Sequence, residues 1–201
     1  MGLIWLMGEK GAASKERMIK AMALSLETKG YNGTGLNDIV ESSGAPKGSI
    51  YFHFPGGKED LAAEAITVSG RAMGNMLLSL LLSSKSPSNA VLSIFKSLEN
   101  KLIETNYTQG CPVATTASET VVEGNPVNEA CRNIFSEWNQ GLESYFVRMG
   151  WEKKSASILS TSILCLLEGA ILLSRTHQNP EPLRSAAKTA KLLVQQGEKN
   201  R

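Results

Sequence analysis

Several hydrogen-bond donors gather near position 50, in a stretch whose pattern predicts two short helices joined by a tight turn. Lys47 can reach a phosphate oxygen or a guanine edge, and the Ser49 hydroxyl can bond either a base or the backbone. The phenol of Tyr51 and the imidazole of His53 are further phosphate donors. These side chains favour a helix that contacts a DNA duplex, although Tyr51 fits a core position equally well.

Two short helices must position these donors. Apolar residues recur at helical spacing from Leu36 to Val40, and Thr34 precedes them as the predicted helix cap. Gly44 supplies the left-handed conformation that a tight turn needs, and Pro46 suits the first turn of a second helix. The pattern predicts a helix-turn-helix, whose second helix enters the major groove. Helical hairpins without a nucleic-acid partner also use such turns.

A longer set of residues surrounds this hairpin and carries a family resemblance. Its members are Arg17, Gly30-Tyr31, Thr34, Asp38-Ile39, Gly44, Lys47-Gly48-Ser49-Ile50-Tyr51, His53-Phe54 and Lys58-Glu59-Asp60-Leu61. Over roughly residues 14 to 65 this set resembles the DNA-binding domain of TetR-family repressors. The run from Gly110 to Ala114, followed by Ser118-Glu119, is similar to the YxaF/LmrA-like branch, whose members resemble drug- or flavonoid-responsive repressors.

The pattern and the resemblance together predict the contacts to DNA. The predicted contact residues are Lys15, Thr34, Lys47, Gly48, Ser49, Tyr51, Phe52, His53 and Lys58. Bulk charge does not support them: the chain carries a net charge of +2, and its first 64 residues hold seven Lys or Arg against eight Asp or Glu. DNA binding therefore depends on where individual cations stand.

The sequence gives no sign of catalysis or of a metal. It contains no GxSxG, phosphate-binding loop or HExxH motif. Cys111, Cys131 and Cys165 form no CxxC pair, and two histidines, His53 and His177, are too few and too far apart for a zinc site. We expect no cofactor, no metal and no enzymatic activity.

Hydrophobic residues make up 42% of the 201 residues, enough for a folded core, and their helical periodicity predicts an all-α protein. We expect a disordered arm over residues 1–13, a helix-turn-helix domain over 14–57, and a helical ligand-binding and dimerisation domain over 58–201. The apolar run Leu3–Met7 is too short for a signal or a membrane span, and translation starting at Met7 is the alternative to an arm. The predicted helices cover about 14–29, 58–83, 88–103, 111–123, 126–150, 154–177 and 182–196, beside the hairpin.

The second domain has the composition of a small-molecule pocket, with apolar helices and few internal polar groups. The candidate ligand contacts are Met76, Phe95, Leu98, Tyr107, Cys111, Glu119, Phe135, Trp138 and Asn139. Each of them also fits a plain core or surface role. Glu168 lies in the middle of an apolar helix and needs a partner if buried, either across a dimer interface or from a ligand.

The last two helices are apolar on several faces, which predicts that a second copy covers them. The candidate interface residues are Ile163, Leu164, Leu167, Ala170, Ile171, Ala186, Ala190 and Leu193. In TetR-like proteins the last two helices do form the dimer contact.

We therefore predict a cytoplasmic homodimeric repressor, without membrane attachment, that leaves a palindromic double-stranded operator when a small hydrophobic inducer binds. The alternatives are a TetR-type activator, and a helical carrier or enzyme whose three-helix head only docks protein. Transcription measurements separate the first alternative, and DNA binding separates the second.

Overall fold

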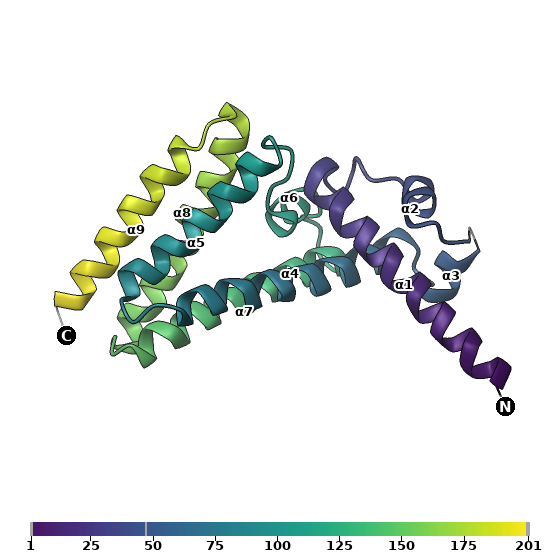
Figure 1. The fold of residues 1–201 in the computed structure, drawn as a ribbon, viewed down its shortest axis with the longest axis horizontal. Helices are drawn as coiled ribbons and strands as arrows, with labels where there is room; N and C mark the ends of the chain where they lie inside the picture. The colour runs from purple at the N-terminus through teal and green to yellow at the C-terminus, as the bar shows by residue number, and fades with distance from the viewer. Residues whose placement is uncertain (1, 47, 200–201) are drawn as a thin grey trace. The chain divides into compact units, whose positions relative to one another are not determined.

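The computed structural model describes residues 2–46 and 48–199, and every regular element within those ranges is an α-helix (Figure 1). This confirms the predicted all-α fold. The helices form two compact units, Met1–Gly70 with Pro112–Ile134, and Arg71–Cys111 with Phe135–Arg201. We call them the head unit and the cavity unit. The predicted boundary at residue 58 differs from this division, because the start of the long helix at Lys58 and the segment from Pro112 belong to the head unit.

The head unit is built around its first helix. It contains α1 (Gly2–Lys29), α2 (Leu36–Ser43), α3 (Ser49–His53), α6 (Pro112–Glu119) and the beginnings of α4 (Lys58–Leu82) and α7 (Pro126–Arg148). Met18, Met22 and Leu26 form a fully buried stripe on α1, at the spacing that places side chains on one helical face. This helix packs against α2, α3 and α6. The core of the head therefore includes a segment more than eighty residues away in the chain.

The first helix begins earlier than predicted. It starts at Gly2 rather than at Ser14, so the structure differs from the predicted disordered arm over residues 1–13. Residues 2–13 contain no proline to stop the helix, although their three glycines lower its propensity. Ser14 consequently lies inside α1, where it is buried, and does not act as the helix cap.

Thr34 does not cap α2 as predicted. The N-cap is Gly35, which makes no side-chain capping bond. The Thr34 hydroxyl instead donates to the Gly30 carbonyl at 2.6 Å and shares a 2.8 Å hydrogen bond with the Ser25 hydroxyl. Thr34 is only 2% exposed, so these bonds satisfy it within the core of the head.

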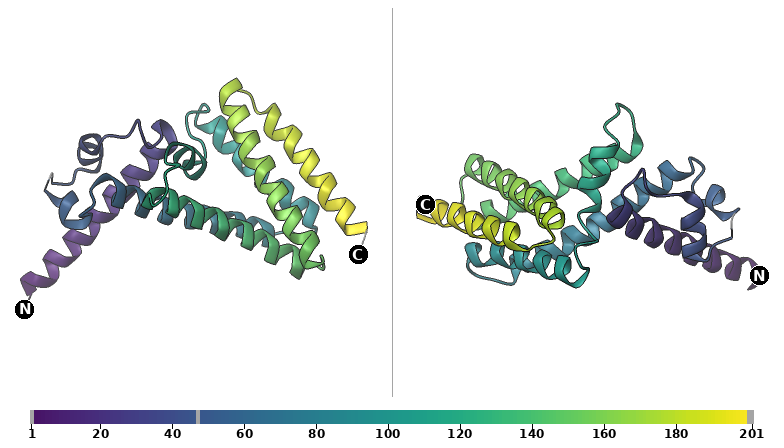
Figure 2. Two further views of the ribbon diagram at one scale, coloured as in Figure 1. Left: turned by 180° about the vertical axis from the view of Figure 1, so that it is seen from behind. Right: turned by 90° about the horizontal axis from the view of Figure 1, so that it is seen from above.

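The cavity unit contains the later helices. They are α5 (Pro87–Glu104), α8 (Lys153–His177), α9 (Glu181–Lys199) and the remaining parts of α4 and α7. Helix α5 begins at Pro87, one residue before the prediction, because the Ser86 hydroxyl accepts from the Asn89 amide and proline suits the first turn. Helix α6 ends at Glu119, four residues before the predicted end. Figure 2 shows α8 and α9 side by side, and α5 packs against both.

One ion pair joins α5 to α9. The Glu99 carboxylate, 7% exposed, accepts from Arg184 Nη2 at 2.8 Å and from Arg184 Nε at 3.0 Å, while Lys96 lies 3.2 Å away. Burial alone raises the pKa of Glu99, but hydrogen bonds from Arg184 and Lys96 outweigh it and hold the pKa below its ordinary value. The pair therefore stabilises the α5–α9 contact as a charged group.

Candidate nucleic-acid interface and ligand cavity

The turn between α2 and α3 depends on Gly44. Its φ of 61° lies in the left-handed region, and its amide donates to the Glu41 carbonyl at 3.3 Å. Arg17 of α1 donates from Nε to the Ser43 carbonyl at 3.0 Å. The end of α2 is thus tied to α1, and the chain leaves it in a fixed direction toward α3.

Helix α3 divides its side chains sharply between core and solvent. Ile50 and Phe54 are 2% and 1% exposed and anchor it to the head, whereas Tyr51 and Phe52 are 64% and 80% exposed. The His53 ring packs edge-on against Phe52, with centroids 4.9 Å apart. Two large aromatic side chains are thus exposed side by side on a helix whose other face is anchored in the core.

The residues at the N-terminal end of α3 have small side chains and access to solvent. Gly48 is exposed, and a Cβ at that position would meet no atom within 4 Å. The Ser49 hydroxyl donates to the Pro46 carbonyl at 2.6 Å and keeps its acceptor lone pairs and part of its surface in solvent. The predicted contact Lys47 lies outside the described residues. Gly48, Ser49, Tyr51, Phe52 and His53 are together on one short helix with solvent access.

Three of the residues predicted to contact DNA make side-chain contacts within the head unit. Thr34 is buried, as described above. Lys15 forms a 2.7 Å ion pair with Glu64 and lies over the Phe54 ring. Lys58 lies over the Tyr31 ring, 4.2 Å from its centroid. The contacts of Lys15 and Lys58 hold α1, α4 and the α1–α2 loop together, and both side chains keep part of their surface in solvent, so their assignment as DNA contacts stays a prediction. Buried Thr34 has no such surface.

Glu119, predicted as a ligand contact, belongs to the head unit. Its carboxylate accepts from the Asn32 amide at 2.7 Å and so joins the end of α6 to the loop before α2. Burial lowers the pKa of Lys58, and the negative charge of Glu119 opposes that shift. Glu119, Lys58 and Tyr31 therefore form one connected group around this loop.

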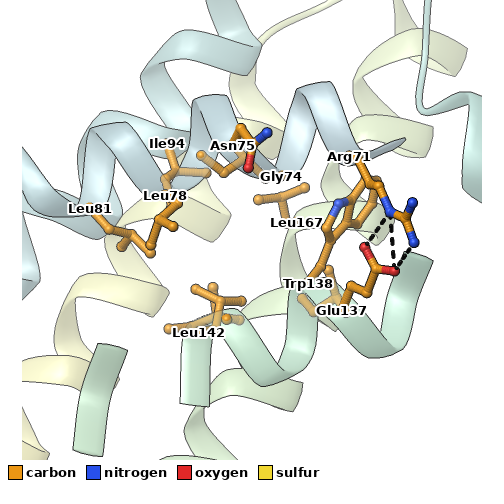
Figure 3. A pocket seen from close by; sticks show the side chains of 14 residues that line it. Arg71, Gly74, Asn75, Leu78, Leu81, Ile94, Glu137, Trp138, Leu142 and Leu167 are labelled. Atoms are coloured by element: carbon orange, nitrogen blue, oxygen red, sulfur yellow. Dashed lines mark hydrogen bonds and ion pairs between the residues drawn. The ribbon is translucent and has the colours of Figure 1, made fainter. Parts of the chain in front are cut away.

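The cavity unit encloses a cavity of about 280 Å³ (Figure 3). Its walls are apolar, with Leu78 of α4, Leu142 of α7 and Leu167 of α8 pointing inward. Trp138 forms one wall, and a Cβ at Gly74 would lie 2.9 Å from its indole ring. Gly74 therefore leaves the space in which the indole stands.

A charged pair lies at one end of this cavity. Arg71 Nη2 donates to Glu137 Oε1 at 2.9 Å, and Arg71 Nε contacts both carboxylate oxygens (Figure 3). The hydrogen bond from Arg71 holds the pKa of Glu137 below its usual range. Both side chains are largely exposed, so this end opens to solvent.

A second, smaller chamber of about 20 Å³ lies beside the first. Leu77, Trp138, Leu164 and Leu167 line both. Glu168 and Cys111 are among the residues that line only the small chamber. Both carboxyl oxygens of Glu168 are buried and accept no hydrogen bond from the residues that the structure describes.

Comparison with known proteins decides the family. Residues 87–189 match the family described as "Transcriptional regulator LmrA/YxaF-like, C-terminal domain", and residues 19–65 match "Bacterial regulatory proteins, tetR family". The first match covers about half of the chain. The chain belongs to the TetR family. It is a DNA-binding transcriptional regulator with an LmrA/YxaF-like C-terminal domain, as the resemblance implied.

Whole-chain relatives agree with this assignment. The HTH-type transcriptional regulator LmrA of Bacillus subtilis (strain 168) is 36% identical over 170 residues, which cover 85% of this chain and 90% of the relative. The HTH-type transcriptional regulator YxaF of the same organism is 34% identical over 181 residues, which cover 90% of this chain and 95% of that one. These relatives are regulators and not enzymes, which sets aside the carrier-or-enzyme alternative.

Solved structures share the fold. The regulatory protein TetR from Rhodobacter sphaeroides superposes with a TM-score of 0.79 at 22% identity, covering 89% of this chain and 97% of its own. A TetR-family transcriptional regulator from Cytophaga hutchinsonii gives 0.80 at 21% identity, covering 92% and 94%. A head with a helix-turn-helix followed by a helical domain is therefore the TetR fold.

Only part of the predicted ligand set lines the two chambers of this TetR-type domain. Trp138 lines both, and Leu98 and Cys111 line the smaller one. The other six predicted positions lie elsewhere. Met76 is 40% exposed, Phe95 is buried, and Phe135 packs edge-on against Trp138. The Tyr107 carbonyl accepts from Arg175, the Asn139 side chain accepts from Thr161, and Glu119 belongs to the head unit. These six are not among the lining residues.

The residues predicted for the dimer contact face the interior of the cavity unit. Ile163, Leu167, Ala170, Ile171, Ala186 and Ala190 are at most 9% exposed, and Leu164 and Leu193 are half-buried. They pack α8 against α9 and α5. The outward face of the two helices carries different apolar residues: Ile158, Leu172, Leu173 and Leu192 are all at least 50% exposed. The predicted interface residues therefore lie mostly inside the cavity unit, and the exposed apolar residues of the two helices lie on the opposite side.

Two helices, Lys58–Leu82 and Lys153–His177, are long and apolar enough to cross a membrane by length and composition alone. In this chain α4 runs from the head unit into the cavity unit, and α8 packs on α5 and α9. Their hydrophobicity is weak evidence of a membrane span.

The pairing of Arg71 with Glu137 was not predicted. The two residues are 66 positions apart and are connected by no local pattern, so only the folded unit brings them together. A signal did exist for the outward face of α8: Ile158, Cys165 and Leu172 recur every seven residues, and all three are exposed.

Proposed function

We propose that the protein is a homodimeric repressor that binds a pseudo-palindromic operator and releases it when a small hydrophobic molecule enters the cavity unit. The observation that carries the DNA contact is the exposure of Tyr51 and Phe52 on a helix anchored by Ile50 and Phe54. A regulator that used α3 only for folding would not leave these two rings in water.

The proposed DNA contacts are the solvent-facing residues of the hairpin. Tyr51 donates its phenol to a phosphate, Phe52 makes an apolar contact with a thymine methyl group or a sugar, and His53 donates to the backbone. Gly48 allows close approach, and Ser49 bonds a base or a phosphate. Lys47 remains a proposed phosphate contact from its position in the sequence.

The proposed dimer uses the outward face of α8 and α9. Ile158 and Leu172 of α8 and Leu192 of α9 are each at least 60% exposed, so both helices present apolar surface to solvent. Gly169 lies between the α8 residues, and a Cβ there would meet no atom within 4 Å, so another helix can approach closely. Two copies of this pair give a four-helix interface, and the twofold axis brings two heads onto successive major grooves about 34–36 Å apart.

The proposed inducer site is the cavity beside Trp138. Two covalent routes lead from its walls to the head unit. Helix α4 carries Leu77 and Leu78 of the cavity and begins at Lys58 in the head. Gly110 and Cys111 of the small chamber precede α6, which ends at the Glu119–Asn32 bond. A ligand that moves either segment changes how the heads are held, a coupling of about 1–3 kcal/mol by general precedent.

A titration of DNA from upstream of the protein's own gene tests the DNA-binding proposal. We expect a saturable, salt-sensitive shift in a gel assay, with affinity falling steeply as salt rises because Lys and Arg release counterions from phosphates. The double variant Leu172→Glu/Leu192→Glu should be monomeric and lose most operator affinity. Salt-insensitive binding, or undiminished affinity in the monomer, would contradict the proposal. A reporter assay separates repression from activation, and the proposed location is the cytoplasm, where the operator is.

A further inference from the structure

Glu168 is a buried acid without a partner. It stands in the middle of α8, and neither of its carboxyl oxygens accepts a hydrogen bond from the described residues or reaches solvent. An unpaired carboxylate in an apolar interior is strongly unfavourable. A folded chain keeps such a group at the wall of a chamber only at a cost in stability, which a bound partner would relieve.

The surroundings of Glu168 offer little compensation. Leu98, Trp138 and Leu164 supply apolar surface to the same chamber. The titratable groups that face it are the Cys111 thiol and Lys101 of α5. Burial raises the pKa of Glu168 to about 7, and the Cys111 thiol, a weak donor, only partly opposes that shift. Near neutral pH the carboxyl group is therefore ready to ionise when a positive charge arrives.

The two chambers differ greatly in volume, so a ligand that fills both needs one large part and one small part. The chamber at Glu168 is about 20 Å³, room for a group the size of a water molecule, whereas the neighbouring cavity is about 280 Å³. Leu77, Trp138 and Leu167 border both spaces. A molecule with a large apolar body and one small polar head matches this pair of volumes.

We infer that the cavity unit binds hydrophobic amines, with the protonated amine on Glu168 and the apolar body against Trp138 and the leucines of the larger chamber. An ammonium both donates to the carboxylate and neutralises it, whereas a neutral hydroxyl only donates. The Trp138 ring adds a cation–π surface beside the head group. The inference rests on the proposed inducer site but not on operator binding.

Calorimetry on the full-length protein without DNA tests this assignment with three matched probes: 1-naphthylmethylamine, 1-naphthalenemethanol and 1-methylnaphthalene. At pH 8 we expect the amine to bind at least tenfold more tightly than the alcohol. Its affinity should fall about tenfold per pH unit below 7, as Glu168 takes up a proton, while the affinity of the alcohol stays within twofold.

Two variants locate the effect. Glu168→Gln should weaken amine binding at least tenfold and abolish its pH dependence, with alcohol binding nearly unchanged. Glu137→Gln is the matched control, because Glu137 lines the larger cavity but is already paired with Arg71, and it should leave the amine preference intact. Thermal unfolding at each pH confirms that both variants are folded.

Equal binding of amine and alcohol at pH 8 would overturn the inference, and so would an unchanged amine affinity in Glu168→Gln. Loss of the amine preference in Glu137→Gln rather than in Glu168→Gln would move the site to the other acid and overturn it as well. Absence of binding by all three probes has the same consequence. None of these results bears on the gel assay with operator DNA, so failure of the two proposals is distinguishable.

Discussion

The two units of this regulator place their functional side chains in opposite environments. In the head, the proposed DNA contacts Tyr51 and Phe52 stand in solvent and contribute little to folding. In the cavity unit, Trp138 and Glu168 lie inside and affect the packing of several helices. Function and stability should therefore be separable in the head and coupled in the cavity unit. The predictions below test that contrast, from the largest expected effect to the smallest.

The neighbouring aromatics of α3 give the sharpest test in the head. Phe54→Ala should lower the free energy of unfolding by about 3–5 kcal/mol, because it empties a fully buried position. Phe52→Ala, at a position 80% exposed, should change stability by less than about 0.5 kcal/mol yet weaken operator binding roughly tenfold or more. Denaturant unfolding and DNA titration measure the two quantities. Comparable loss of stability in both variants would contradict the claim that function and stability are separable in the head.

Glu168→Gln should do the reverse in the cavity unit, raising stability while weakening ligand binding. The folded protein keeps Glu168 protonated up to a pKa of about 7, whereas the unfolded chain ionises near the ordinary value of 4.5. Stability is therefore lost as pH rises from about 4.5 to 7. At pH 8 the variant should be more stable than the wild type by roughly 3 kcal/mol, and below pH 4 the difference should shrink toward zero. Unfolding curves at several pH values check this, and a pH-independent difference would contradict it.

Gly74 and Gly141 form a matched pair within the larger cavity. Gly74→Ala places a Cβ 2.9 Å from the Trp138 indole, so the ring must move, at a cost of about 1–2 kcal/mol despite the better helix propensity of alanine. Gly141→Ala meets no atom within 4 Å and should stabilise the helix by about 0.5–1 kcal/mol. Tryptophan fluorescence should shift in the first variant and not in the second. Equal stability changes would show that the cavity is not set by Gly74.

An effect similar in size to that of Gly74→Ala is expected at the α5–α9 ion pair. Glu99→Gln should cost about 1–2 kcal/mol, a value reduced by the partial exposure of Arg184. Because the folded pKa of Glu99 is lowered, its contribution is fully present above the ordinary value of 4.5 and is lost as pH falls through the folded value. Wild type and variant should therefore converge in stability in strong acid. A gap that persists there would exclude the charge as the cause.

The contrast between the units also explains which features of the two sites could be predicted from the sequence. In the head, the proposed DNA contacts lie within one short stretch, so local rules for the turn at Gly44 and the anchor Ile50 predicted their arrangement. The predicted cap of α2 was wrong, because the Thr34 hydroxyl donates to the Gly30 carbonyl and Gly35 takes the N-cap position.

In the cavity unit, four helices (α4, α5, α7 and α8) contribute to the walls, and periodicity alone does not tell which face of an apolar helix turns inward. Trp138 of α7 and Cys111 before α6 were predicted as lining residues, while Met76 of α4 and Asn139 of α7 are not among the lining residues. Periodicity could not separate the two faces of α8 for the same reason, since α8 is apolar both toward α9 and toward solvent. Glu168 stood out in the sequence because a lone acid in an apolar helix is costly wherever it faces.

The most direct test of the account is a guanine N7 methylation-protection experiment on the operator with the wild-type dimer and the Phe52→Ala variant. Two heads that insert α3 into successive major grooves should protect two patches of guanines about 10–10.5 base pairs apart, and Phe52→Ala should lose both together. Protection confined to one patch, or an unchanged pattern in the variant, would contradict the claim that the exposed face of α3 reads the DNA.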